Sequence, residues 1–370
     1  MTATFAVLAG GGTAGHVHPA LAIADSLVEK GHERATIHFI GAQRGMESRL
    51  VPQHAYPITV LDVRGFERRV TPRSVLANAG AAAHLVRATL RCLRLLGRMR
   101  PRVVVSVGGY ASLPPVLAAV VRRIPVVTVS YDAVPGRATR LAARFAAASA
   151  VAFPGSSLPR HVVTGAPLRA ALVAVDPARD RGAARRRLGL ANDRFVLLVV
   201  GGSLGSGRLN GVTRRFVADR HGRTDLAVRH VTGTRDEGPG LDPMTGGDQI
   251  VYQPVRYEDD MPSAYAAADA VLARAGATTV AELAALGLPS ILVPWPLAAE
   301  DHQTANARVL ADVDGAILVP DGELDAARLD DELSRLADPD TRAKIGHAAA
   351  SVGRRDGAAR VAALVAEHAR

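Results

Sequence analysis

The sequence has few of the residues that typify secreted, membrane-spanning or nucleic-acid-stacking proteins. Cys92 is the single cysteine among 370 residues, so no internal disulfide can form, and the chain fits a reducing compartment. Aromatic residues are only 4%, which argues against single-stranded nucleic-acid binding because that relies on stacking. No run of about 20 uncharged apolar residues occurs, and the first apolar segment is too short for a signal peptide and lacks a basic leader. We therefore expect no membrane span and no nucleic-acid partner.

Lysine is scarce as well. Lys30 and Lys344 are the only two, yet the formal net charge is +10, so the basic excess is almost entirely arginine. A biased genome composition could favour arginine over lysine, but the positive charge itself favours an anionic partner, such as a phosphate-rich substrate or a membrane surface.

Strand-like runs alternate with helical patterns through both halves of the chain, which predicts parallel sheets with crossover helices. In the first half we expect strands at 5–9, 36–40, 58–63, 103–107, 126–129 and 150–153, with a helix at 18–30. In the second half we expect them at 195–200, 227–232, 249–252, 270–273, 290–294 and 316–319. With 48% hydrophobic residues, the chain has enough material for two cores.

The predicted fold class is thus α/β, with two similar domains. Residues 1–164 form the first domain, 165–340 the second, and 341–370 a C-terminal helix that we expect to pack back on the first domain. Ligands of such sheets bind at the carboxyl ends of the strands, so a cleft between the two domains is the expected site.

A glycine loop follows the first strand of each half. The first reads Gly10-Gly11-Gly12-Thr13-Ala14-Gly15-His16-Val17-His18-Pro19 and the second Gly201-Gly202-Ser203-Leu204-Gly205. Unpaired N–H groups at a helix start suit an anionic ligand, although a tight turn without a ligand is the plainer alternative. The first loop formally fits a dinucleotide fingerprint, but the second strand ends in Gly41-Ala42-Gln43 with no acid for a ribose, which disfavours a nicotinamide enzyme.

Seven segments in order resemble the MurG family, the UDP-N-acetylglucosamine transferases that complete lipid II in peptidoglycan synthesis. They are GGGTAGHVHP at 10–19, GMESRLVP at 45–52, VGGY at 107–110, GAPLR at 165–169, GGSLG at 201–205, RAGATTVAE at 274–282 with GLP at 287–289, and DHQTANA at 301–307. The resemblance covers nearly the whole chain. It implies the GT-B glycosyltransferase fold, in which two Rossmann-like domains face a cleft.

The resemblance also implies a set of binding residues. For the donor these are Thr13, Ala14, Gly15, Asp132, Arg169, Ser203, Ala277, Thr278, Thr279, Glu282 and Gln303; for the acceptor they are Gly12, Gly108, Gly109 and Tyr110. Carboxylates can accept hydrogen bonds from ribose hydroxyls, and N–H groups at a helix start can donate to phosphate. The alternatives are an ordinary helix-start acid at Glu282, a solvated arginine at Arg169 and a surface glutamine at Gln303.

His16 is the candidate general base. Its imidazole, with an ordinary pKa near 6.5, suits removal of a proton from the acceptor's 4-hydroxyl, and attack opposite the leaving UDP would invert the anomeric centre. His18 is the near alternative, and a loop-anchoring role for His16 is the other. No Asp-x-Asp pair lies in a nucleotide loop, so we expect no metal and no cofactor.

One segment departs from the family pattern. Where the family carries His-Glu-x-Asn, this chain has Val129-Ser130-Tyr131-Asp132. An aspartate cannot donate an amide proton as asparagine does, so contacts at this loop are in doubt, and a different acceptor is left open.

A basic amphipathic helix is predicted between 84 and 98. Arginines recur at 87, 91, 94 and 98, beside Val86, Leu90, Leu93 and Leu96, and Arg64, Arg68, Arg69 and Arg73 surround Phe66 nearby. Such a helix is typical of a membrane surface, although a crossover helix with a solvated face is the alternative.

These observations predict an inverting transferase that moves N-acetylglucosamine from UDP-N-acetylglucosamine to undecaprenyl-linked lipid I. It would act as a peripheral protein at the cytoplasmic face of the cell membrane. The alternatives are a GT-B transferase for another lipid or natural product, a UDP-N-acetylglucosamine epimerase-like enzyme, and a non-enzymatic sugar-nucleotide-binding regulator.

Overall fold

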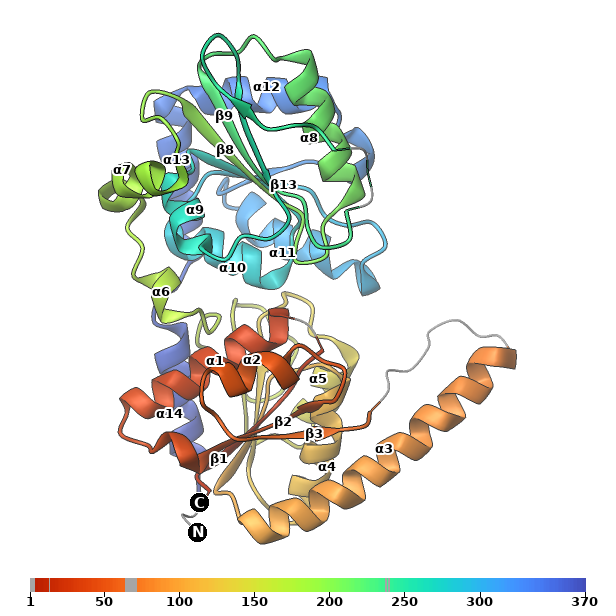
Figure 1. The fold of residues 1–370 in the computed structure, drawn as a ribbon. Helices are drawn as coiled ribbons and strands as arrows, with labels where there is room; N and C mark the ends of the chain where they lie inside the picture. The colour runs from red at the N-terminus through yellow and green to blue at the C-terminus, as the bar shows by residue number, and fades with distance from the viewer. Residues whose placement is uncertain (1–3, 13, 64–71, 237, 239) are drawn as a thin grey trace. The chain divides into compact units, whose positions relative to one another are not determined.

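The computed structural model describes the chain except residues 1–3, 13, 64–71, 237 and 239, and it describes only the backbone of 14, 72–77 and 79. The chain divides into two compact units (Figure 1). Unit 1 comprises residues 1–169 and 355–370, and unit 2 comprises residues 170–354. The junction therefore follows Arg169, five residues beyond the expected one.

Unit 1 is built on a parallel sheet of seven strands in the order β3-β2-β1-β4-β5-β6-β7. The strands are β1 (Ala6–Ala9), β2 (Ile37–Ala42), β3 (Ile58–Leu61), β4 (Val103–Ser106), β5 (Val126–Ser130), β6 (Ala148–Val151) and β7 (His161–Val163). The central strands β1 and β4 are buried at every position, as expected when helices cover both faces of a parallel sheet. The first six strands were predicted, with ends shifted by one to two residues, and β7 was not.

The helices of unit 1 are α1 (Ala14–Glu29), α2 (Glu47–Gln53), α3 (Pro72–Met99), α4 (Leu113–Val121), α5 (Arg137–Ala143) and α14 (Gly357–His368), with short 3₁₀ turns η1 (Arg34–Thr36) and η2 (Tyr110–Ser112). Helix α3 packs on α4, and α14 packs on α1. Ala88, Cys92 and Leu96 of α3 are buried in the core of the unit.

The expected single helix from residue 341 is wrong. Residues 339–368 form two helices: α13 (Pro339–Val352) belongs to unit 2, and α14 belongs to unit 1. The break begins at Gly353, where a Cβ would overlap the backbone of Ala284, and α14 begins at Gly357, where a Cβ would overlap Ala166. Close backbone packing at these two glycines therefore stops one helix and starts the next.

Unit 2 repeats the arrangement of unit 1. Its strands lie in the order β10-β11-β9-β8-β12-β13-β14, with only β10 antiparallel. They are β8 (Phe195–Val200), β9 (Leu226–Val231), β10 (Met244–Thr245), β11 (Val251–Val255), β12 (Ala270–Ala273), β13 (Ser290–Leu292) and β14 (Ile317–Leu318). The duplicated α/β layout is confirmed, and β10 is an addition that was not predicted.

The helices of unit 2 are α6 (Ala170–Val173), α7 (Pro177–Leu188), α8 (Gly207–Asp219), α9 (Met261–Ala267), α10 (Ala277–Leu286), α11 (His302–Ala311), α12 (Ala326–Ala337) and α13, with η3 (Ala299–Asp301) and η4 (Asp321–Glu323). Local sequence sets the ends of α7: Asp176 accepts from the N–H groups of Ala178 and Arg179, and Gly189 ends the helix at φ 66°. In the described part of the chain, no helix is long and apolar enough to cross a membrane.

Candidate functional site

The candidate residues of unit 1 gather where three neighbouring strands end. Strand β1 lies between β2 and β4. From β1 the chain continues through β2 and β3 toward one edge of the sheet, and from β4 it continues toward the other edge, so the strand order reverses beside β1. The first glycine loop follows β1, Gly108 and Gly109 follow β4, and Tyr131 and Asp132 follow β5. Such a point, where the strand order reverses, is where open α/β sheets bind ligands.

The two glycine loops of unit 1 pack directly on each other. A Cβ at Gly109 would lie 2.6 Å from the carbonyl oxygen of Gly11, and Gly109 itself has φ 76°. Gly12 has φ 106°, and no described atom lies within 4 Å of a Cβ built there. Its N–H donates to Glu47 Oε2 at 2.9 Å. The predicted contact residue Thr13 lies outside the described residues, and so does the side chain of Ala14.

His16 lies in the first turn of α1, against the loop that contains Gly108 and Gly109. A Cβ at Gly108 would lie 3.1 Å from its Cδ2 and 3.3 Å from its Nε2. The ring meets that of Tyr131 edge-on, with centroids 6.0 Å apart. Burial lowers the pKa of His16 below its ordinary 6.5, and the negative charges of Asp132 and Glu47 partly oppose that shift. The imidazole is therefore mostly neutral at pH 7 and able to accept a proton.

His18 is the weaker candidate for a base. Burial and the charges of Arg169 and His54 lower its pKa to about 4. Its Nδ1 is buried without a hydrogen-bond partner among the described residues. Burial lowers the pKa of both histidines, so the preference for His16 rests on its packing against Gly108 and Tyr131.

We expect the imidazole of His16 to titrate below pH 6.5, because burial disfavours its charged form. Replacing Asp132 by asparagine removes a negative charge and should lower that pKa further. Histidine-selective NMR titration of the wild type and of Asp132→Asn measures both, with His16→Gln to assign the resonance. A pKa that does not fall in Asp132→Asn would contradict the placement of Asp132 beside His16.

In unit 2 the second glycine loop follows β8, and the segment after β9 holds its backbone through hydrogen bonds. The N–H and Oγ1 of Thr234 donate to the carbonyl oxygen of Ser203 at 3.2 and 3.1 Å. Gly205 has φ 89°, and a Cβ there would overlap the carbonyl of Thr232. Ser206 caps α8, so the N–H groups of that helix start lie next to the loop.

Arg274 joins the strand ends of unit 2. Its Nε donates to Ser206 Oγ at 3.0 Å, and its Nη1 donates to the carbonyls of Val293 and Pro294 at 3.1 Å each. It also pairs with Asp321 at 2.6 Å. The guanidinium thus fixes the loops after β8, β12 and β13 relative to one another, a role that the sequence did not reveal.

Glu282 is held in place by a tyrosine. It lies in the second turn of α10, not at the helix start as predicted, and its Oε2 accepts from Tyr265 Oη at 2.8 Å. Tyr265 is buried, with 1% of its surface exposed. Ala277, Thr278 and Thr279 form the first turn of α10, after Gly276 at the N-cap, so their N–H groups are those left unpaired by the helix.

Gln303 and Asn306, both on α11, support the neighbouring turns. Gln303 Oε1 accepts from the Trp295 N–H at 2.9 Å, and the buried Asn306 donates to the carbonyl of Ala275 at 3.3 Å. One end of the Gln303 amide therefore holds the loop after β13.

The predicted donor residues do not all lie in one unit. Arg169 and Asp132 lie in unit 1, where their charges act on His18 and His16 respectively. Ser203, Glu282 and Gln303 lie in unit 2. The structure thus places Asp132 beside the candidate base.

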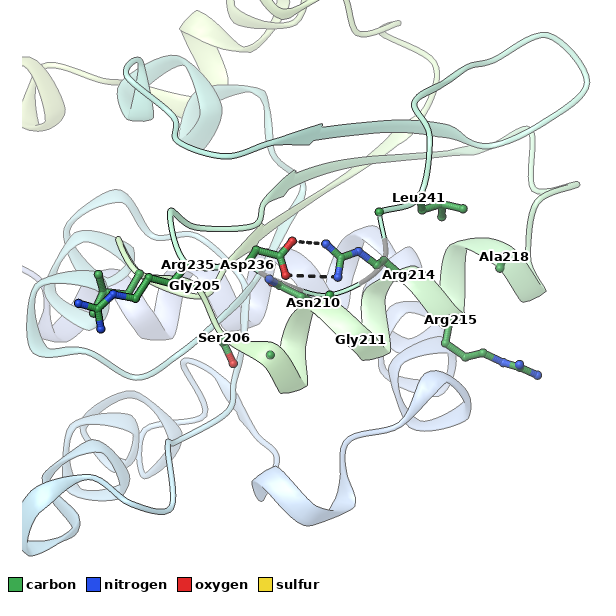
Figure 2. A pocket seen from close by; sticks show the side chains of 14 residues that line it. Gly205, Ser206, Asn210, Gly211, Arg214, Arg215, Ala218, Arg235, Asp236 and Leu241 are labelled. Atoms are coloured by element: carbon green, nitrogen blue, oxygen red, sulfur yellow. Dashed lines mark hydrogen bonds and ion pairs between the residues drawn. The ribbon is translucent and has the colours of Figure 1, made fainter.

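A pocket of about 790 Å³ lies between α8 and the segment after β9 (Figure 2). It shares Leu204 and Gly205 with the second glycine loop, but none of residues 277–282 nor Gln303 lines it. Figure 2 shows Arg214 facing Asp236, with which it forms an ion pair, while Arg215 and Arg235 point away from that pair. Among the described residues, no group of three or more His, Cys, Asp or Glu side chains is arranged to hold a metal ion.

The sequence is similar to glycosyltransferases along nearly its whole length. Residues 6–151 match the glycosyltransferase family 28 N-terminal domain, and residues 196–361 match the family's C-terminal domain. A protein of Clavibacter michiganensis subsp. michiganensis is 41% identical over 366 residues, which is 98% of this chain and 96% of that protein. A Streptomyces coelicolor protein is 40% identical over 351 residues, 95% of this chain and 94% of its own. Both are named UDP-N-acetylglucosamine--N-acetylmuramyl-(pentapeptide) pyrophosphoryl-undecaprenol N-acetylglucosamine transferase.

Solved structures agree on the fold. The crystal structure of Acinetobacter baumannii MurG has a TM-score of 0.75 at 26% identity and covers 99% of this chain and 100% of its own. The UDP-GlcNAc 2-epimerase from Neisseria meningitidis has a TM-score of 0.63 at 12% identity, with 99% of each chain covered. At that identity the epimerase shares the two-domain fold and supports no statement about activity.

Proposed function

The chain belongs to the MurG family of family 28 glycosyltransferases, and from this premise we propose how it transfers N-acetylglucosamine from UDP-N-acetylglucosamine to lipid I, the undecaprenyl-pyrophosphoryl-linked N-acetylmuramyl-pentapeptide. The observation that carries the activity is similarity of 40–41% to transferases of that name over 95–98% of the chain. The reaction is a glycosyl transfer, and the fold is the GT-B fold of such enzymes. The roles of individual residues, the stereochemistry and the membrane contact are our proposals.

In the proposed mechanism, His16 takes the proton from the 4-hydroxyl of the acceptor sugar. The hydroxyl oxygen attacks the anomeric carbon, and the bond to UDP breaks with its electron pair on the departing diphosphate. Attack opposite the leaving group inverts the anomeric centre. The lowered pKa of His16 supports this role because the ring is unprotonated at neutral pH.

Residues of unit 2 would bind the donor. The unpaired N–H groups at the start of α10 and in the loop around Ser203 suit the diphosphate, and Glu282 suits the ribose hydroxyls. Gln303 would address the sugar with its amide. Arg274 is a positioning residue in this scheme, because it fixes the loops after β8, β12 and β13, which lead to Ser203, Glu282 and Gln303.

Residues of unit 1 would bind the acceptor. Gly108, Gly109 and Tyr110 supply backbone groups at the start of η2. The Gly12 N–H already donates to Glu47, so Gly12 would contribute only the open space above its Cα, through which a sugar can approach.

A transfer assay with labelled UDP-N-acetylglucosamine and a short-chain lipid I analogue tests this function. We expect labelled disaccharide product and stoichiometric UDP. UDP release without any acceptor would favour the epimerase-like alternative, and transfer only to other lipids or natural products would favour a different GT-B transferase. The comparison of lipid I with other acceptors is informative because this chain has Asp132 where the family has asparagine.

We also propose that unit 1 binds an anionic membrane surface at the cytoplasmic face. On α3, Arg87, Arg91, Arg94 and Arg98 are all exposed. Val86 and Leu90 are 58% and 50% exposed beside them, whereas Leu96 is buried in the core. Val121, on the adjoining α4, is 69% exposed. Basic and apolar groups on one helix suit lipid headgroups and the acyl chains beneath them. The predicted basic loop around Phe66 lies outside the described residues.

Replacing Arg87 and Arg94 by glutamine should weaken binding to phosphatidylglycerol vesicles by about 10- to 30-fold, since each basic residue contributes about 1 kcal/mol at such a surface. Vesicle sedimentation measures it. The matched control replaces two exposed arginines of unit 2, Arg186 and Arg354, by glutamine, which changes the net charge equally. If both double variants lose the same affinity, α3 is an ordinary crossover helix.

A further inference from the structure

A buried carboxylate lies beneath the first glycine loop. Glu47 is the first residue of α2 and is only 2% exposed. Its Oε2 accepts from the Gly12 N–H at 2.9 Å, and its Oε1 accepts from the Ala42 N–H at 2.6 Å. One side chain therefore ties the loop after β1 to the end of β2.

Three glycines make room for this carboxylate. A Cβ at Gly11, Gly41 or Gly45 would overlap the side chain of Glu47. Gly11 lies in the loop after β1, Gly41 is the next-to-last residue of the adjacent strand β2, and Gly45 lies just before α2. The absence of side chains at these positions is explained by the space that Glu47 occupies.

A strand, glycine loop and helix often hold a phosphate on their N–H groups, and here the carboxylate of Glu47 accepts from one N–H of that loop. Loop N–H groups in such a motif point at an anion. Here one of them is already paired with an internal anion, and a bound diphosphate would face a like charge a few ångströms away. Like-charge repulsion therefore disfavours a diphosphate at the same N–H group.

We propose that Glu47 is a positioning residue whose carboxylate fills the anion position of the first glycine loop, so that this loop presents His16 instead of binding the acceptor diphosphate. The inference deepens the proposed function and rests on it for the role of His16. Glu47 holds Gly12, Gly11 packs on Gly109, and His16 packs on Gly108. The loop after β4, at Gly108 and Gly109, is left as the backbone site for the acceptor diphosphate.

Electrostatics support the same role. The charge of Glu47 opposes the effect of burial on the pKa of His16, as does that of Asp132, and Tyr131 is the third titratable group that faces the ring. Glu47 therefore acts on the base through both the loop and its charge.

Glu47→Gln and Glu47→Asp separate these two effects. Glutamine has one carbonyl oxygen and an amide group that cannot accept, so it cannot pair with both N–H groups; aspartate keeps the charge but is one methylene too short. We expect kcat to fall by about 10- to 100-fold in both, because small displacements of a catalytic group are costly. Only Glu47→Gln should move the acid limb of kcat/KM to lower pH. The Kd for UDP should stay within about twofold of the wild type.

The matched control is Glu332→Gln. Glu332 is also buried, at 3%, and pairs with Arg328 and Arg335 in unit 2. We expect its loss to lower the melting temperature and to leave kcat within about twofold. A folded Glu47→Gln enzyme that keeps more than a third of wild-type kcat, or an acid limb that does not move, would overturn the proposal.

A measurement without turnover keeps the inference testable even if the acceptor is misassigned or Glu47→Gln does not fold. Amide hydrogen exchange of the loop after β1 should be slow in the wild type and unchanged by millimolar inorganic pyrophosphate, because the anion position is filled. It should be at least tenfold faster in Glu47→Asp. Protection of this loop by pyrophosphate in the wild type would show that it binds phosphate and that the proposal is wrong.

Discussion

Replacing His16 by alanine is expected to lower kcat by about 10²- to 10⁴-fold, the range for loss of a general base. The Kd for UDP should change by less than about twofold, because the nucleotide motif lies in unit 2 while His16 lies in unit 1. The reason is the environment of the ring: buried against Gly108 and Tyr131, it is unprotonated at pH 7 and supported by the charge of Asp132. The transfer assay and calorimetric titration with UDP, on one preparation, measure the two quantities.

His18→Ala is the comparison that decides which histidine acts. Burial lowers the pKa of both histidines, so the choice rests on the packing of His16 against Gly108 and Tyr131, and we expect loss of His18 to lower kcat less than tenfold. A His16→Ala enzyme that keeps more than about a third of wild-type turnover at saturating substrates would exclude His16 as the base. Parallel losses of melting temperature and UDP affinity would instead indicate a loop anchor.

The fold was largely predictable from the sequence because buried parallel strands leave continuous apolar runs. Strands β8 and β12 were predicted with their observed ends, and β1 within one residue. Strand β7 was missed because it has three residues, two of them exposed, and β10 because it has two. The break before α14 was missed because an alanine- and arginine-rich segment reads as one helix. The contact between Gly353 and Ala284 that ends α13 joins residues far apart in the sequence.

The site was predictable only as far as its motifs. The glycine loops, His16 and Glu282 stand in recognisable patterns, and the structure places His16 in α1 and Glu282 in α10. Glu47, Arg274 and Tyr265 had no predicted role because what they do depends on partners 35, 68 and 17 residues away. For Glu47 a signal was present: the glycines at 11, 41 and 45 together imply a bulky neighbour, but only once the strands are paired.

Glu282→Ala is expected to weaken UDP binding by about 30- to 150-fold. Two hydrogen bonds from ribose hydroxyls to a carboxylate are worth about 2–3 kcal/mol together, and 1.4 kcal/mol is a factor of ten. The hydrogen bond from the buried Tyr265 fixes the carboxylate before the ligand arrives, so little ordering cost is added on binding. Calorimetric titration with UDP measures the loss, and Tyr265→Phe, which removes this hydrogen bond but keeps the carboxylate, should show a smaller one.

The ribose itself provides the sharper test. If Glu282 binds its hydroxyls, the wild type should prefer UDP to 2′-deoxy-UDP, and Glu282→Ala should lose that preference along with its affinity. Asp331→Ala, which removes an exposed carboxylate from α12 in the same unit, should keep both. A Glu282→Ala protein that binds UDP more weakly but still discriminates between the two nucleotides would show that the carboxylate orders α10 without touching the ribose. Unchanged affinity in a folded variant would remove Glu282 from the donor site.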